Sequence, residues 1–312
     1  NALATPVIVG RKPEHEKFPG AVDTYCIEAM MQDGKALQAG TSHFLGQNFA
    51  KSANISFINA NNQPEYAYTT SWGVSTRLIG GVIMTHADDE GMVVPPRIAP
   101  YQVIFVPVVK NPEDEATVLE YIAKLQKELS GKTAFGEKIR CKTDKRDRKS
   151  VDKFWEWTRK GAPVICEIGM RDVEGGKVMV KERLKLGTPE GKEIIAAEDF
   201  VNSIADRLEN IQQQMFDKAK ARQNLNVRTD IKTQAEFQKY FAESNIWIED
   251  GKAGKVAFVR GKWSGDANSE ELLKAMKITI RCIPFDQSGT EGECLLTGKP
   301  GATTDVIYAR SY

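Results

Sequence analysis

Residues 37–44 read Leu-Gln-Ala-Gly-Thr-Ser-His-Phe, and this stretch says more about fold and function than any other. The pattern predicts a strand that ends at a glycine turn and leads into a helix. Gln38, Thr41 and His43 crowd this junction, where polar side chains face a cleft more easily than a core. The alternative is that the hydroxyl side chains cap the next helix and that His43 is a hydrogen-bonded core residue.

A second informative stretch, residues 68–77, reads Tyr-Thr-Thr-Ser-Trp-Gly-Val-Ser-Thr-Arg. It predicts a strand followed by a buried helix that starts near Thr76. The helical spacing is set by Leu78, Ile79, Val82 and Ile83. Arg77 would then stand at the helix N-terminus, where a cation opposes the helix dipole and calls for an anion. An ordinary structural salt bridge of Arg77 is the alternative.

These stretches belong to a first segment, 1–99, which we expect to be α+β with an antiparallel sheet. The strands of these two stretches are predicted at 35–39 and 66–72, each ending at a glycine. The proline-rich run 95–100 stiffens the backbone and suits a linker, so the first domain boundary is placed there.

Two more segments follow the linker. In 100–224, apolar strands at 102–109, 163–168 and 177–181 alternate with helices, which predicts an α/β domain with a partly parallel sheet. This segment ends in an amphipathic helix whose apolar stripe is Phe200, Ile204, Leu208, Ile211 and Met215. Residues 225–312 return to a small α+β pattern, with a helix at 233–243 and strands near 257, 279 and 306.

The overall charge predicts no affinity for nucleic acid, because 43 Lys and Arg are balanced by 42 Asp and Glu. A local exception is 140–160, which holds nine Lys or Arg, four Asp or Glu, and three aromatic residues, Phe154, Trp155 and Trp157. Cations beside aromatic rings suit single-stranded RNA. The alternative is a solvated charged face with a core-facing aromatic stripe.

Five scattered cysteines without a Cys-x-x-Cys pair argue against a disulfide framework, so we expect them to be reduced and mostly buried. No apolar run approaches the length of a membrane span, and no signal-peptide pattern is present. A cytoplasmic protein without membrane contact is the expectation.

Several motifs in order resemble prolyl-tRNA synthetases of the archaeal and eukaryotic type, which are class II aminoacyl-tRNA synthetases. They are Phe18-Pro-Gly-Ala-Val, Ile27-Glu-Ala-Met-Met31, Gln38-Ala-Gly-Thr-Ser-His43, Leu45-Gly-Gln-Asn-Phe49, Ser71-Trp-Gly-Val-Ser-Thr-Arg77, Val94-Pro-Pro-Arg-Ile-Ala99, Glu167-Ile-Gly-Met-Arg-Asp172 and Arg281-Cys-Ile-Pro-Phe285. The resemblance implies part of a class II antiparallel-sheet catalytic domain, an α/β anticodon-binding domain and a small α+β C-terminal domain.

The same resemblance implies proline–tRNA ligase activity, in which ATP, used with Mg²⁺, activates proline before transfer to tRNA(Pro). It assigns ATP contacts to Gln38, Thr41, Ser75 and Arg77, with Arg77 on the triphosphate. It places His43 in the proline pocket and names His43 and Arg77 as the catalytic pair. Phe18 and Trp72 would wall that pocket; for both, a core aromatic is the alternative.

For the anticodon, the resemblance selects Lys153, Glu167 and Arg171. The match around Lys153 departs from the Gly-Trp-Lys-Phe of relatives, which puts the role of that loop in doubt. Many relatives also bind zinc through four cysteines in the last domain. Here only Cys282 and Cys294 are available and Leu296 replaces a third, so no zinc is predicted.

The first two class II motifs should precede residue 1, so the chain is expected to start inside the catalytic domain and to be inactive alone. The resemblance implies a homodimer for the full-length enzyme. The competing hypothesis is a non-catalytic tRNA-binding paralogue; the joint presence of Gln38, Thr41, His43 and Arg77 argues against it.

Overall fold

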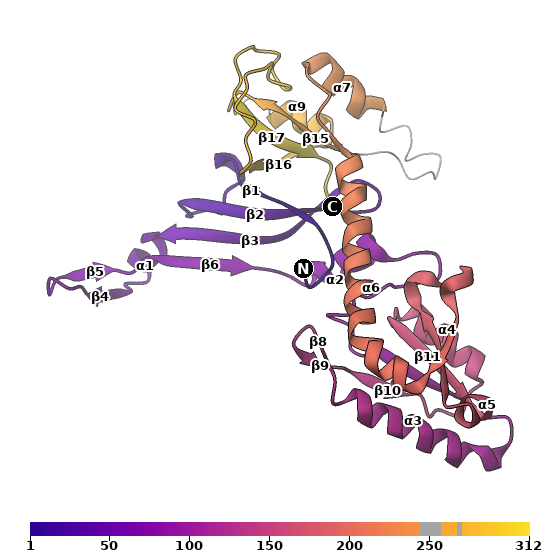
Figure 1. Cartoon of the computed structure of the whole chain (residues 1–312). Helices are drawn as coiled ribbons and strands as arrows, with labels where there is room; N and C mark the ends of the chain where they lie inside the picture. Colours follow the sequence, from indigo (N-terminus) through magenta and orange to yellow (C-terminus); the bar gives the residue numbers. More distant parts are fainter. Residues whose placement is uncertain (244–256, 267–269) are drawn as a thin grey trace. The chain divides into compact units, whose positions relative to one another are not determined.

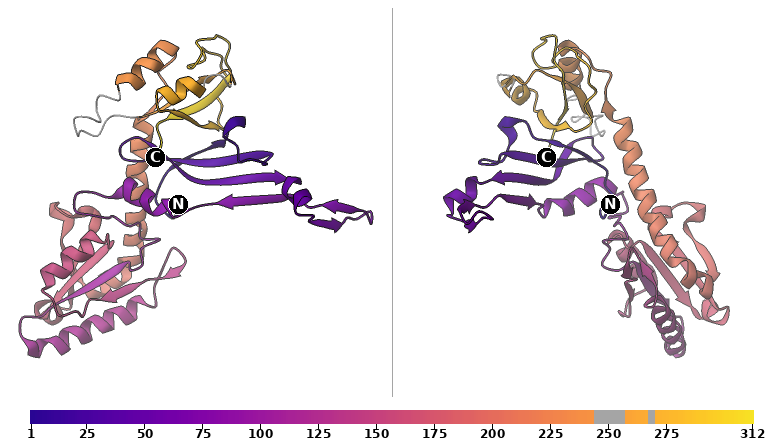
Figure 2. Two further views of the ribbon diagram at one scale, coloured as in Figure 1. Left: turned by 180° about the vertical axis from the view of Figure 1, so that it is seen from behind. Right: turned by 60° about the vertical axis from the view of Figure 1, so that its left-hand side comes forward.

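The computed structural model describes residues 1–243, 257–266 and 270–312. The chain forms two compact units, one of residues 1–5 and 82–219 and one of residues 6–81 and 220–312. Each unit therefore combines segments that are distant in sequence (Figures 1 and 2).

An eight-stranded sheet forms the centre of the second unit, in the order β14-β15-β17-β16-β1-β2-β3-β6. The strands are β1 (Val7–Arg11), β2 (Asp23–Met30), β3 (Ala36–Gly46), β6 (Thr69–Gly73), β14 (Val227–Arg228), β15 (Phe258–Trp263), β16 (Thr279–Pro284) and β17 (Thr304–Ala309). All neighbours are antiparallel except β14 and β15. The expected antiparallel sheet is confirmed.

The described part of this unit also contains short helices and a hairpin. They are η1 (Glu14–Glu16), α1 (Asn48–Ser52), α2 (Arg77–His86, of which 77–81 belong here), α7 (Gln234–Glu243), α9 (Glu270–Ala275), and the hairpin of β4 (Ser56–Ile58) and β5 (Pro64–Tyr66). Phe237 and Phe241 of α7 pack with Tyr308 of β17 in a buried aromatic cluster. This cluster anchors the C-terminal part of the unit.

The predicted turn and helix after Gly40 are wrong. β3 runs without interruption for 11 residues, from Ala36 to Gly46. Gly40 is paired with Ile27 of β2, and the adjacent Thr41 is paired with both β2 and β6, so sheet hydrogen bonding holds the strand extended through the glycine. Local glycine propensity is overridden here by tertiary pairing on two sides.

The C-terminal strands are continuous with the N-terminal ones. β16 pairs with β1 through Gly10 with Pro284 and Arg11 with Ile283. The compact units thus divide the chain differently from the three expected segments, and boundaries near 99 and 224 stay a prediction.

The first unit contains a five-stranded sheet in the order β10-β7-β11-β12-β13. Its strands are β7 (Val103–Val108), β10 (Cys141–Thr143), β11 (Val164–Gly169), β12 (Lys177–Glu182) and β13 (Glu193–Ala196). β10, β7 and β11 are parallel, whereas β12 and β13 are antiparallel, as the predicted partly parallel sheet requires. The other elements are η2 (Pro112–Asp114), α3 (Glu115–Leu129), β8 (Thr133–Ala134), β9 (Glu137–Lys138), α4 (Ser150–Arg159), α5 (Met170–Glu174), η3 (Arg183–Lys185), η4 (Pro189–Gly191) and α6 (Ala197–Leu225, of which 197–219 belong here).

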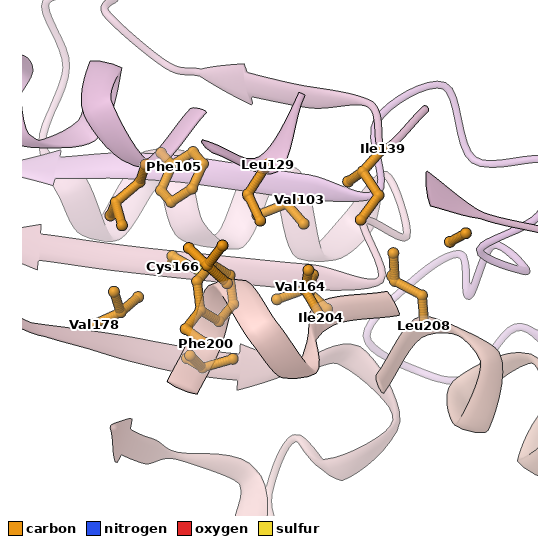
Figure 3. Close-up of a cluster of buried hydrophobic side chains, with 14 of the residues drawn as sticks. Val103, Phe105, Leu129, Ile139, Val164, Cys166, Val178, Phe200, Ile204 and Leu208 are labelled. Atoms are coloured by element: carbon orange, nitrogen blue, oxygen red, sulfur yellow. The ribbon is translucent and has the colours of Figure 1, made fainter. Parts of the chain in front are cut away.

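Both faces of this sheet are covered, which explains the unbroken apolar run of β7. Phe105 belongs to a cluster with residues of α3 and α6 on one face, and its ring meets the Phe200 ring edge-on (Figure 3). Ile104 packs with Phe154 of α4 in a separate cluster. The apolar stripe predicted on α6 is fully buried, as expected. Among the described residues, no helix is both long and apolar enough to cross a membrane.

Candidate functional site

Gln38, Thr41 and His43 lie on one face of β3. In a regular strand, Gln38 and Thr41 would point to opposite faces, because side chains alternate. A bulge at Ala39 removes the conflict: Gln38 pairs with Glu28, while Thr41 pairs with Cys26 two residues earlier on β2. The bulge therefore brings all three predicted polar residues to the same side of the sheet.

Thr24 holds His43 and the loop before β2 together. Its side chain is 2% exposed, and Oγ1 lies 3.0 Å from His43 Nδ1. The same oxygen accepts a hydrogen bond of 3.2 Å from the amide N–H of Phe18. The Phe18 ring stands 4.8 Å from the His43 ring between centroids, so the two are neighbours. Phe18 is 46% exposed, which argues against a purely core role.

Thr24 was not among the residues selected from the sequence. A signal was present, because Thr24, Cys26 and Glu28 alternate with the larger apolar Tyr25 and Ile27. Such alternation marks a strand with one polar face.

The face beside Thr41 is open. Thr41 stands opposite Gly73 of β6, which has no side chain, and His43 stands opposite Ser71. Thr41 and His43 are half-buried within the strand, so Thr41 caps no helix and His43 is not enclosed in a core. The alternative of a helix cap at Thr41 is therefore wrong, whereas the role of His43 stays a prediction.

Arg77 is the first residue of α2, as predicted. Because β6 is antiparallel to β3, the chain leaves Gly73 toward the Gln38 end of β3 and then reaches Arg77. The amide N–H of Arg77 donates to Ser75 Oγ at 3.3 Å, which caps the helix start. The Arg77 side chain is exposed, and within 1–243, 257–266 and 270–312 it forms no ion pair. The structural salt bridge proposed as an alternative thus has no partner there.

Trp72 projects from the face of the sheet opposite to Thr41 and His43. It pairs with Ser42, and it is 78% exposed. It lines an apolar cavity of about 340 Å³ whose lining also includes Thr41, Val9 and Ile27, so Trp72 and Thr41 border the same space.

A second polar region lies in the other unit, at the carboxyl end of β7. A cavity of about 510 Å³ is lined by six cationic side chains and two carboxylates. The cationic residues are Lys110, Lys145, Arg146, Arg148, Lys149 and Lys153. The excess of positive charge suits a phosphate-bearing ligand.

The three residues selected for the anticodon differ in position. Lys153 is 6% exposed, lines this cavity and donates from Nζ to the Asp144 carbonyl at 3.2 Å. Glu167 forms an ion pair with Lys181. Lys181 Nζ in turn lies 4.0 Å from the centroid of the Phe154 ring, and Phe154 is the residue after Lys153. Arg171 is exposed on α5 and does not line the cavity.

The aromatic residues of 140–160 serve mainly the interior. Phe154 is 7% exposed, and Trp157 is half-buried and donates from Nε1 to Asp144 Oδ2 at 2.8 Å. Trp155 is 40% exposed. Arg146 donates to Asp144 and holds the pKa of that carboxyl well below its usual value. Base stacking is thus offered by Trp155 rather than by the whole stripe.

The cysteines form no disulfide, and the C-terminal tyrosine contacts the start of β3. All five thiols are free, and four are buried. The described part of the chain holds no group of three potential metal ligands; the absence of zinc stays a prediction. Tyr312 donates from its amide to the Ala36 carbonyl at 3.3 Å, and its hydroxyl meets Asp33 Oδ2 at 2.5 Å, so the tail lies along the start of β3.

Two family profiles match the chain. The anticodon binding domain family matches residues 102–207, and the prolyl-tRNA synthetase C-terminal family matches residues 251–312. The basic cavity lies within the first match.

Curated relatives align along the whole chain. A proline–tRNA ligase of Paramagnetospirillum magneticum is 50% identical over 99% of this chain and 60% of its own length. One from Protochlamydia amoebophila is 46% identical over 100% of this chain and 60% of its own length. The chain thus spans about three fifths of these relatives.

A solved structure shows the same fold. The prolyl-tRNA synthetase of Cryptosporidium parvum, crystallised with L-proline and AMP, matches with a TM-score of 0.81 at 34% identity. The match covers 100% of this chain and 62% of that one.

Proposed function

Because this chain belongs to the prolyl-tRNA synthetase family, we propose that the protein containing it is a proline–tRNA ligase. In the reaction, the proline carboxylate attacks the α-phosphate of ATP, which gives prolyl-adenylate and pyrophosphate. The prolyl group then passes to the 3′ end of tRNA(Pro), and AMP leaves. ATP enters as its magnesium complex. The named relatives and the solved neighbour support this assignment.

The observation that carries the proposal is the common face of Gln38, Thr41 and His43, reached by the bulge at Ala39. We assign Gln38 and Thr41 to the nucleotide. We also assign to the nucleotide Ser75 and Arg77, which follow Gly73 in the chain. The Arg77 guanidinium, exposed and without an ion pair in the described residues, can bind phosphate oxygens as negative charge moves onto pyrophosphate.

We assign His43 and Phe18 to proline. The Thr24 hydroxyl accepts from Phe18, so donation of its own hydrogen to His43 Nδ1 satisfies all three groups. That arrangement leaves Nε2 of His43 as the donor offered to a ligand. The Phe18 ring supplies an apolar surface for the pyrrolidine ring of proline. Trp72 stays a proposed wall of the proline pocket, and its place in a cavity that Thr41 also lines supports this.

The basic cavity is assigned to the anticodon of tRNA(Pro). Lys153 lies inside it, and the neighbouring cations can neutralise phosphates. Glu167 and Arg171 remain candidates on adjoining elements. A carboxylate such as Glu167 can accept hydrogen bonds from unpaired bases.

The remaining proposals concern the whole protein. We propose that it acts as a cytoplasmic homodimer, needs no zinc, and has domain boundaries near 99 and 224. The chain spans about 60% of its curated relatives, and we propose that these 312 residues alone do not activate proline.

The test is proline-dependent exchange of pyrophosphate into ATP by the full-length protein. We expect exchange in the unmodified protein, loss of at least about 100-fold in Arg77→Ala, as for one lost transition-state donor, and none from the chain alone. Arg97→Ala, from the other unit, is the matched control and should retain activity. Absence of exchange with tRNA binding preserved would instead identify a non-catalytic tRNA-binding protein.

A further inference from the structure

Three buried charged residues meet beside the Gln38 end of the candidate site. Glu28 is 0% exposed, Lys12 is 4% exposed and Arg281 is 8% exposed. Lys12 Nζ lies 3.3 Å from Glu28 Oε1 and donates to the Arg281 carbonyl at 2.8 Å. Arg281 donates to Glu28 Oε2 from Nε at 3.0 Å and from a terminal nitrogen at 2.9 Å. We call Lys12, Glu28 and Arg281 the buried triad.

The buried triad joins three strands of very different sequence position. Glu28 belongs to β2, Lys12 follows β1, and Arg281 comes from β16, 253 residues after Glu28. Arg281 also donates to Thr279 Oγ1 at 3.0 Å, which orients its guanidinium on its own strand. A buried carboxylate held by two cations has one arrangement that satisfies all partners, so its position is tightly set.

Glu28 is also the residue directly opposite Gln38. The register shift that creates the bulge occurs between Ile27 and Glu28. Glu28, which the buried triad anchors, is therefore the β2 residue that borders the bulge. Opposed residues of an antiparallel pair project from the same face. Glu28 and Gln38 are therefore neighbours on the face that also carries Thr41.

We infer that the buried triad is a positioning device through which the C-terminal strands set nucleotide affinity, with Glu28 holding Gln38 in place. The inference rests on the proposed function of Gln38. It assigns to Arg281 a role in ATP binding, although Arg281 belongs to the matched C-terminal family region and not to the catalytic motifs.

The experiment uses the full-length protein that contains this chain. KM for ATP and KM for proline are measured by pyrophosphate exchange for Glu28→Gln, Arg281→Met and the double variant. We expect each single variant to raise KM for ATP about tenfold, within the loss expected from displaced positioning groups, with KM for proline within twofold. The double variant should be no worse than the worse single variant, because the two residues act as one unit.

Arg260→Met is the matched control, because Arg260 is another arginine of this sheet whose ion pairs are with Asp286 and Asp305. Its KM values should not change. If Arg281→Met does not fold, Arg281→Lys keeps the charge without the planar fork and should show the same selective rise.

Two results separate the possible failures. An active unmodified protein whose folded variants change both KM values equally, or neither, would overturn the role of the buried triad alone. An unmodified protein without proline-dependent exchange would overturn the proposed function together with this inference.

Discussion

Replacing Thr24 by valine tests the part of the candidate site that we propose for proline, because it removes a hydroxyl and keeps the shape of the side chain. Two hydrogen bonds are lost, the one with His43 Nδ1 at 3.0 Å and the one from the Phe18 amide at 3.2 Å. Each such bond contributes about 0.5–1.5 kcal/mol, so the free energy of unfolding should fall by about 1–3 kcal/mol.

The effect on catalysis follows from the loss of orientation of His43. If the imidazole spends most of its time away from its Thr24-bound position, proline binding weakens by about 1.4 kcal/mol, which is a tenfold rise in KM for proline. KM for ATP should stay within twofold, because Gln38 and Thr41 do not depend on Thr24 for their pairing partners.

The assay is pyrophosphate exchange by the full-length protein with either substrate varied, and thermal melting verifies folding. Thr24→Ser retains the hydroxyl and is the control, with KM values close to those of the unmodified protein. A KM for proline that is the same in Thr24→Val and Thr24→Ser would refute the reasoning. So would an equal rise in both KM values.

Three further predictions concern stability and tRNA binding. Ile204→Ala removes a fully buried α6 side chain and should lower the free energy of unfolding by about 2–5 kcal/mol in urea, whereas exposed Asp206→Ala should not. Burial raises the pKa of Asp305, but hydrogen bonds from Lys262 and Ser288 outweigh burial and lower this pKa to about 2. The ionised Asp305 therefore stabilises the fold fully above the ordinary pKa of 3.8, and this stabilisation disappears as pH falls through about 2. Thermal melting between pH 2 and pH 5, the range those values define, should therefore be less pH-dependent in Asp305→Asn. Lys149→Ala should weaken tRNA(Pro) binding and reduce the slope of log Kd against log salt by about one.

Local sequence patterns were sufficient to predict an element where its own period shows which of its residues are buried. The stripe on α6 predicted its buried residues because period and burial coincide in an amphipathic helix. The apolar run of β7 was identified as a strand for a similar reason, since both of its faces are covered. These features depend only on neighbours in sequence.

The site depended on information that sequence spacing does not contain. Gln38 and Thr41 are three residues apart, and only the bulge at Ala39 places them on one face. Trp72 lies close to these residues in the resemblance, but it pairs with Ser42 and so projects from the other face of the sheet. Its position in the sequence gave no indication of that pairing. Strand register decides both outcomes, and register is set by pairing between strands.

The pairing of β16 with β1 is the clearest example of a feature that depends on strands distant in sequence. Arg281 reaches Glu28 only because strands from the two ends of the chain are neighbours in one sheet. A buried carboxylate left without Arg281 would retain Lys12 alone at 3.3 Å, and the loss of a charged partner in the interior is strongly destabilising. The sheet beside Gln38, the end of the candidate site that we propose for the nucleotide, is therefore completed by the C-terminal strands. This gives a physical reason for these two distant segments to remain in one polypeptide.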